Sequence, residues 1–202
     1  MKTLRHFSRD ALPAMPWKNG GGTTQEIACG PPGATLGDFG WRVSIATIAA
    51  AGPFSVFAGI DRSIMLLEGD GVRLRSSDGR IDHRLDALHR PFAFPGDTAI
   101  DCALLGGASS DFNVMTRRGQ WRAEVQVVDR AASIAAAPHG VLLALRGRWT
   151  LNTDAPACRE GEGLCWSGAP MAWRAVPVGA HARLAVVRIV PVSSAENEEG
   201  SP

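Results

Sequence analysis

Short runs of alternating apolar and polar residues recur along the chain, and glycine or proline separates most of them. Successive side chains of a β-strand point to opposite faces, so a period of two indicates strands rather than amphipathic helices. Many short strands between regular turns predict an all-β protein, an antiparallel β-sandwich or β-barrel. The clearest runs cover residues 41–48, 63–68, 72–75, 123–128, 141–145 and 184–190.

A weak internal repeat indicates that the chain is built from two similar halves. Residues 66–71 and 142–147 share the spacing Leu-Leu-x-x-x-Gly, and a strand-like run follows each final glycine. We therefore expect an N-terminal half over residues 1–120, which would hold the ligand pocket, and a C-terminal half over residues 121–192. The acidic tail 193–202 has few apolar residues and is expected to be disordered.

The composition fits one ordinary domain or two such halves. The 202 residues are 45% hydrophobic and 20% charged, which is enough apolar material for a core. The formal net charge of +1 argues against a nucleic-acid-binding protein. No apolar stretch approaches the about 18 residues of a membrane helix, and residues 1–17 lack the apolar segment of a secretory signal. A cytoplasmic protein without membrane contacts is expected.

Neither the cysteines nor the histidines form a recognisable metal or catalytic motif. No C-x-x-C, H-x-H, H-E-x-x-H or G-x-S-x-G pattern occurs in the sequence. Without an export signal, buried free thiols are expected rather than disulfides. The residues concerned are Cys29, Cys102, Cys158 and Cys165, and His6, His83, His89, His139 and His181.

A glycine-rich segment near the N-terminus is the first candidate for ligand binding. Gly20–Gly22 lets backbone amides approach a ligand or another strand closely, and Lys18 is one of only two lysines in the chain. Lys18 would supply a positive charge, and Asn19 both a donor and an acceptor. The spacing of a phosphate-binding loop is absent. A simple bend that leads into the first strand is the alternative interpretation.

The run at residues 41–46 predicts a strand with one apolar and one polar face. Trp41 and Val43 share the apolar face, whereas Arg42 and Ser44 share the other. If the polar face looks into a barrel, the Arg42 guanidinium can bind a carboxylate with two hydrogen bonds. If it looks outward, Arg42 is simply solvated, and the sequence leaves both alternatives open.

Two further segments carry polar residues in strand-like surroundings. Asp61 and Arg62 are adjacent, and neighbours of opposite charge are most typical of a surface turn. In extended form Asp111, Asn113 and Met115 would share one face of a strand, and the apolar residues that alternate with them would share the opposite face. That arrangement is typical of a pocket wall that forms hydrogen bonds.

Four segments together resemble the HutD/Ves family of bacterial proteins. The resemblance implies a cupin-type β-barrel, with two cupin halves in one chain (a bicupin), and often a homodimer. It also implies an association with histidine utilisation, because family members commonly lie beside the genes of that pathway. The segments are Pro16–Thr24, Trp41–Ser44, Gly52–Ser55 with Gly59–Arg62, and Asp111–Met115.

The residues that hold a metal in other cupins are missing from this sequence. A metal-binding cupin carries two histidines and a glutamate in its first motif and a third histidine in its second. The corresponding segments, residues 58–71 and 94–99, contain no histidine, and Glu68 lies in the turn of the first motif rather than at the ligand position upstream of it. A transition metal needs three or four converging donors, which His139 and His181 alone do not provide. We expect no metal and no cofactor.

The leading hypothesis is a protein that binds a small anionic metabolite in its N-terminal half. Buried cations need compensation, so several of them around one cavity favour an acidic ligand. Through the resemblance, the ligand would be a carboxylate of histidine catabolism, of the urocanate or formylglutamate class, in a sensing or regulatory role. Charge would come from Lys18, Arg42 and Arg62, hydrogen bonds from Asn19, Ser44, Asp111 and Asn113, and apolar walls from Trp17 and Phe54.

Two other functions are compatible with the sequence. A metal-independent isomerase or hydrolase would use a carboxylate as general base beside a cation, and the candidates are Asp61, Glu68 and Asp111. An oligomerising scaffold would instead have a filled barrel without a binding site. A ligand that raises the melting temperature would argue against the scaffold, because binding to the folded state stabilises it.

Overall fold

The computed structural model describes residues 2–152 and 157–193 and consists almost entirely of β-strands. All strand pairs within these residues are antiparallel, so the predicted all-β, antiparallel fold class is confirmed. The one helical element there is a 3-10 turn, η1 (Arg9–Ala11). The tail expected to be disordered lies outside the described residues from residue 194 onward.

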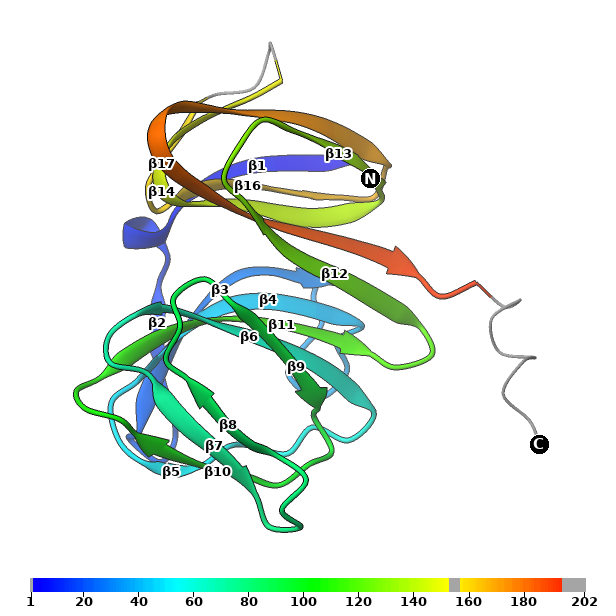
Figure 1. Cartoon of the computed structure of the whole chain (residues 1–202). Coiled ribbons are helices and arrows are strands. Elements are labelled where there is room, and N and C mark those ends of the chain that lie inside the picture. Colours follow the sequence, from blue (N-terminus) through cyan, green and yellow to red (C-terminus); the bar gives the residue numbers. More distant parts are fainter. Residues whose placement is uncertain (1, 153–156, 194–202) are drawn as a thin grey trace.

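The lower part of the molecule in Figure 1 contains two sheets that pack face to face. Ile64 and Leu66 of one sheet share an apolar cluster with Leu74 and Ile100 of the other. The six-stranded sheet has the order β2 (Ala14–Pro16), β3 (Gly22–Gly30), β4 (Trp41–Ile48), β11 (Ser109–Arg117), β6 (Ile60–Glu68) and β9 (Pro91–Pro95). The four-stranded sheet has the order β5 (Gly52–Pro53), β10 (Ile100–Leu104), β7 (Val72–Ser76) and β8 (Asp82–Leu85).

The upper part is one seven-stranded sheet that curls around its own core. Its longest strand pairs with three others, and irregular pairing near Gly147 and His181 lets the sheet bend there, as β-bulges do. The strands are β1 (Thr3–Ser8), β16 (Glu162–Ser167), β14 (His139–Leu151), β17 (Met171–Pro191) and β12 (Trp121–Val128), with β13 (Ala132–Ala137) beside β17 and β15 (Cys158–Arg159) beside β14. The side chains of Trp149, Trp166 and Trp173 lie in the enclosed core.

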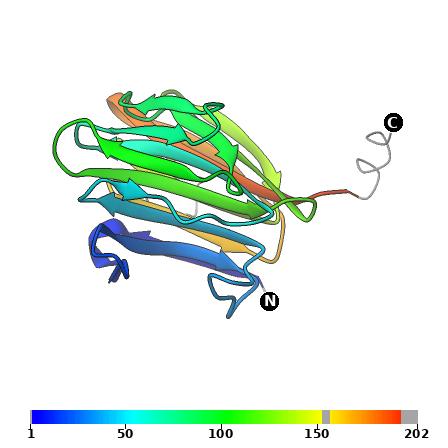
Figure 2. The same cartoon turned by 90° about the horizontal axis from the view of Figure 1, so that it is seen from below.

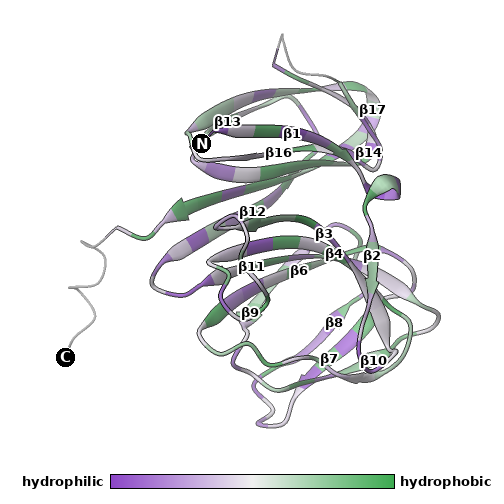
Figure 3. Cartoon of the chain, turned by 180° about the vertical axis from the view of Figure 1, so that it is seen from behind, coloured by the Kyte–Doolittle hydropathy of each residue, from purple (hydrophilic) through white to green (hydrophobic). Residues whose placement is uncertain are grey.

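The six-stranded and seven-stranded sheets share a second apolar core. Trp41, Val43 and Ile45 of β4 pack there with Val141 and Val187 of the upper sheet. Figure 2, which looks from below, shows the strands of the lower part in front of the orange strands of the seven-stranded sheet. Purple and green residues alternate along β12 in Figure 3, as the sequence pattern predicted, and in β4 the apolar residues of the shared core alternate with Arg42 and Ser44. The polar residues of β4 therefore face away from this core.

The first strand of the chain joins the upper sheet. β1 pairs with β16 over six residues, from Thr3 opposite Ser167 to Ser8 opposite Glu162. The segment 1–120, which we expected to form one unit, thus contributes a strand to the sheet that residues 121–191 otherwise build. No helix among residues 2–152 and 157–193 is both long and apolar enough to cross a membrane.

Candidate ligand-binding site

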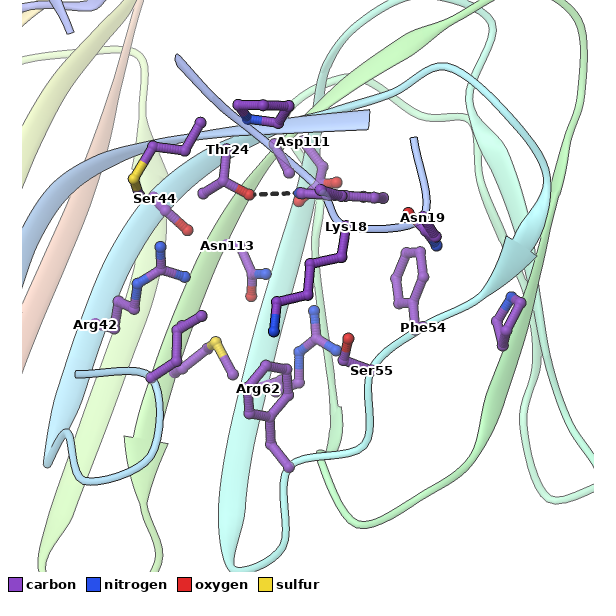
Figure 4. A pocket seen from close by; sticks show the side chains of 18 residues that line it. Lys18, Asn19, Thr24, Arg42, Ser44, Phe54, Ser55, Arg62, Asp111 and Asn113 are labelled. Atoms are coloured by element: carbon purple, nitrogen blue, oxygen red, sulfur yellow. Dashed lines mark hydrogen bonds between the residues drawn. The ribbon is translucent and has the colours of Figure 1, made fainter. Parts of the chain in front are cut away.

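A cavity of about 510 Å³ lies on the polar face of the six-stranded sheet, opposite the shared core. Its lining comes from β2, β3, β4, β5, β6 and β11 and from the loops that follow β2, β3 and β5. Figure 4 shows these side chains gathered around the cavity. All nine residues that we proposed from the sequence line it: Trp17, Lys18, Asn19, Arg42, Ser44, Phe54, Arg62, Asp111 and Asn113.

Strand pairing explains how these residues meet. β11 lies between β4 and β6, and Met115 of β11 is paired with Arg42 on one side and with Arg62 on the other. The two arginines are therefore two strands apart, roughly 10 Å between their Cα atoms, and their side chains share the cavity face. Further along the same face, Asn113 is paired with Ser44.

The sequence favours a surface turn at Asp61 and Arg62, and this interpretation is wrong. Both residues lie within strand β6, so their side chains point to opposite faces of the sheet. Asp61 is exposed and bridges to Arg118, with 2.7 Å between Oδ1 and Nη2, whereas Arg62 is 8% exposed and lines the cavity. Sequence adjacency suggested an ion pair, but the alternation of the strand separates the two charges.

Aromatic rings surround the Arg62 guanidinium. Its central carbon lies 5.4 Å, 5.7 Å and 5.0 Å from the ring centroids of Phe54, Phe57 and Phe94, within cation–π range. Burial lowers the pKa of Arg62 to about 10, an effect that the nearby Asp111 opposes. The Arg62 Nε is buried and has no hydrogen-bond partner within the described parts of the chain.

Asp111 is the buried carboxylate of the cavity. Its exposed fraction is 3%, and burial raises its pKa to about 7 although the positive charge of Arg62 acts in the opposite direction. Asp111 Oδ1, Asn113 Oδ1 and Ser44 Oγ are buried and receive no hydrogen bond from any described residue. Each such atom destabilises the protein by about 1–3 kcal/mol when it stays unpaired. The cavity floor therefore offers polar atoms that a ligand could satisfy.

Arg42 faces the cavity, which decides between the two alternatives left open by the sequence. It is 6% exposed, and its Nε donates a hydrogen bond to Glu26 Oε2 at 2.8 Å. This is the one hydrogen bond that the Arg42 side chain makes to the described residues, and both terminal nitrogens remain for a ligand. Glu26 orients the guanidinium from the neighbouring strand β3.

The glycine-rich segment is both the bend into β3 and a wall of the cavity. A Cβ on Gly22 would lie 2.1 Å from the carbonyl oxygen of Thr47, so only glycine fits. Asn19 Oδ1 accepts a hydrogen bond from the Gly21 amide, and Trp17 Nε1 donates one to Thr24 Oγ1 at 2.7 Å. Lys18 is exposed at the mouth, and Figure 4 shows its side chain pointing into the cavity.

Sequence reasoning missed several residues that also line the cavity. Leu36, in the loop after β3, and Met15, in the three-residue strand β2, are 58% and 52% exposed at its edge, and no alternation pattern marks either residue. Of the three carboxylates considered as general bases, Asp61 and Glu68 do not line the cavity; Glu68 borders a separate crevice of about 200 Å³. The remaining additional lining residues are Pro16, Thr24, Ala46, Pro53, Ser55, Phe57 and Met115.

The cavity residues do not fit a metal ion. The lining includes two guanidiniums, one ammonium and a single carboxylate, and it includes no imidazole or thiol. A transition metal needs three or four converging neutral or anionic donors, and fixed cations repel it. Across residues 2–152 and 157–193, no group of three or more His, Cys, Asp or Glu side chains is placed to hold a metal.

Comparison with known proteins places the chain in a family. The HutD family model matches residues 9–183. The chain belongs to the HutD family. Protein Ves of Citrobacter koseri is 39% identical over 164 residues, which cover 81% of this chain and 83% of that protein. Protein Ves of Cronobacter sakazakii is 41% identical over 150 residues, covering 74% of this chain and 80% of that protein.

Solved structures share this HutD-family fold. A Pseudomonas aeruginosa protein of unknown function is 34% identical with a TM-score of 0.81, covering 93% of this chain and 99% of that one. HutD from Pseudomonas fluorescens is 28% identical with a TM-score of 0.82, covering 95% and 100%. An oxalate decarboxylase from Lactobacillus farciminis shares the fold alone, at 8% identity, a TM-score of 0.61 and coverages of 98% and 90%.

Proposed function

We propose that this protein binds a small anionic metabolite in the cavity of its N-terminal half. One observation carries the proposal: a single cavity of about 510 Å³ is lined by three cationic side chains and by four buried polar atoms that have no hydrogen-bond partner among the described residues. That volume lies in the range of pockets for small metabolites. An acidic ligand would compensate the buried charge of Arg62 and the free nitrogens of Arg42, with Lys18 at the mouth.

We propose that the metabolite is a carboxylate of histidine catabolism, of the urocanate or formylglutamate class. Membership of the HutD family supports this class, through the association with histidine utilisation that the family implies. Binding without turnover fits a sensing or regulatory role. We also propose that the protein is cytoplasmic, that each chain consists of two cupin halves, and that two chains form a homodimer. Light scattering on purified protein tests the homodimer.

Calorimetric titration with urocanate and with formylglutamate tests the binding directly. Replacing Arg42 by Ala removes charged hydrogen bonds to the carboxylate, so we expect affinity to fall by about 1.5–3 kcal/mol. The substitution Arg75→Ala, on strand β7 outside the cavity lining, is the matched control and should leave affinity unchanged. Unchanged affinity in Arg42→Ala would remove Arg42 from the site, and no binding of any carboxylate would refute the proposal.

A metal-independent isomerase or hydrolase is the second candidate, and Asp111 favours it. Burial raises the pKa of this carboxyl to about 7, close to the value that suits a general acid or base at neutral pH. Chelator-treated protein would then convert urocanate or formylglutamate, and Asp111→Asn would abolish the turnover. Stoichiometric binding without turnover would leave the binding function alone.

A further inference from the structure

The cavity has the Arg42 guanidinium at one end and the Asp111 carboxylate at the other, and the Arg62 guanidinium reaches far enough from its strand to interact with Asp111. The backbone positions of Arg42 and Arg62 lie beside Met115 of strand β11, one on each side. Asp111 lies four residues away on the same face of that strand, about 13 Å along it. Figure 4 shows Arg42 and Asp111 at opposite ends, with Asn113 between them.

Asp111 restricts the ligand more than any other polar group in the cavity. An ionised carboxylate only accepts hydrogen bonds, whereas Ser44 can donate or accept and Asn113 can rotate its amide. Asp111 Oδ1 is buried and receives no hydrogen bond from the described residues. A ligand made only of carboxylates would satisfy the arginines but would place negative charge beside Asp111.

We infer that the cavity selects anions that also carry an N–H donor, and that Asp111 is the residue that reads this donor. The inference rests on the anion-binding function proposed above and names its ligand class more closely. The carboxylate of the ligand lies toward Arg42 and Lys18, and its N–H donates to Asp111. Acylamino acids and azole carboxylic acids belong to this class, whereas plain carboxylates of the same size do not.

The surroundings of Asp111 give the two kinds of ligand opposite pH dependence. Among described residues, the charged or titratable groups that interact with it are Arg62 on β6 and Cys102 on β10, while β4 places Ala46 opposite it. Burial, with Asp111 as a second cause, raises the pKa of Cys102 to about 12, so this thiol stays neutral. An N–H donor requires ionised Asp111, whose pKa is about 7, and such a ligand binds more tightly as pH rises from 6 to 8. A plain carboxylate requires the protonated form and binds more weakly over the same range.

The test compares two ligands that differ in one group. N-formylglutamate carries an amide N–H, and its ester analogue 2-formyloxyglutarate has oxygen in that place. Calorimetry with the unmodified protein should give at least about tenfold tighter binding of the amide at pH 8, because the ester leaves Asp111 unpaired. The preference should shrink toward pH 6. Urocanate and 3-(1,3-oxazol-4-yl)acrylate, in which oxygen replaces the ring N–H, form a second pair with the same difference.

A substitution at Asp111 and a matched control complete the test. Asp111→Asn, whose amide can also donate, should reduce the preference to about twofold and abolish the opposite pH trends. Asp61→Asn makes the same chemical change on the exposed face of β6 and should keep the full preference. Equal binding of amide and ester by the unmodified protein, with the same pH trend, would overturn the inference alone. Binding of neither ligand of either pair would overturn the proposed anion site together with it.

Discussion

The molecule has an upper lobe, formed by the seven-stranded sheet, and a lower lobe, formed by the six-stranded and four-stranded sheets. Strand alternation fills the interior of the upper lobe with side chains and leaves a cavity in the lower lobe. In the upper lobe, inward positions carry Leu142, Trp149 and Trp166, and large rings fill the space within the curled sheet. In the lower lobe, inward positions at one end of the six-stranded sheet carry Arg42 and Asn113, and a cavity remains. Among the residues that the structure describes, none beyond 115 lines that cavity. The residue types on the inward face, not the fold itself, decide whether a lobe is filled or hollow.

The comparison also separates stability from binding. Four of the six buried polar atoms without a hydrogen-bond partner among the described residues belong to the cavity of the lower lobe, and such atoms weaken the folded state. The other two are Trp149 Nε1 and Trp173 Nε1 in the upper core, where the buried rings also contribute hydrophobic stabilisation. The lower lobe keeps polar groups that only a ligand would satisfy, as is common at functional sites.

The largest expected effect comes from emptying the filled lobe. Trp149 is completely buried in the upper core, so Trp149→Ala should reduce the free energy of unfolding by about 3–5 kcal/mol in urea denaturation. Trp17→Ala makes the same change in the half-buried wall of the cavity and should cost clearly less. A larger loss from Trp17→Ala would contradict the contrast between the lobes.

Filling the hollow lobe should have a smaller effect of opposite sign. The double replacement of Arg62 by Met and Asp111 by Leu removes both buried charges together, and apolar replacement of such groups stabilises proteins by about 1–4 kcal/mol. Anion binding should be lost in the same variant. The single variant Arg62→Met leaves Asp111 uncompensated and should be less stable than the double one. Chemical denaturation of the original protein and the two variants measures these differences in the free energy of unfolding. A double variant less stable than the original protein would contradict the prediction.

A further effect is the pH dependence of stability that Asp111 causes. Its pKa in the folded state, about 7, lies above its ordinary value of 3.8, so the folded protein holds this proton more tightly than the unfolded chain. The stability from Asp111 is therefore complete below about pH 4 and is lost as pH rises to 7. Asp111→Asn should flatten the difference in unfolding free energy between pH 5 and pH 8. An unchanged pH profile would mean that Asp111 titrates normally.

Much of the lower lobe could be predicted because strand alternation is a local signal. It predicted the faces of β4 and β11 and hence that Arg42, Ser44, Asp111 and Asn113 could meet. It could not predict which side of a sheet is covered, so the direction of Arg42 stayed open. Loop residues such as Leu36 carry no periodic signal, and adjacent charges concealed the strand at Arg62. Whether the cavity residues bind a metabolite stays a prediction.

Long-range pairing also lay beyond local patterns. Nothing in the sequence of β1 indicates that its partner is β16, because pairing between distant strands depends on the arrangement of the whole sheet. The curl of the upper sheet arises from irregular pairing in β14 and β17, which a repeat of Leu-Leu-x-x-x-Gly does not specify. Tertiary context, rather than propensity, decides both features.

The union of β1 with β16 has a consequence for biosynthesis. The ribosome releases residues 3–8 long before residues 162–167 exist, so the earliest strand waits for one of the latest. During this interval its backbone N–H and C=O groups form an open edge that other nascent chains could join. Final closure of the upper lobe must therefore follow the synthesis of residues 162–167.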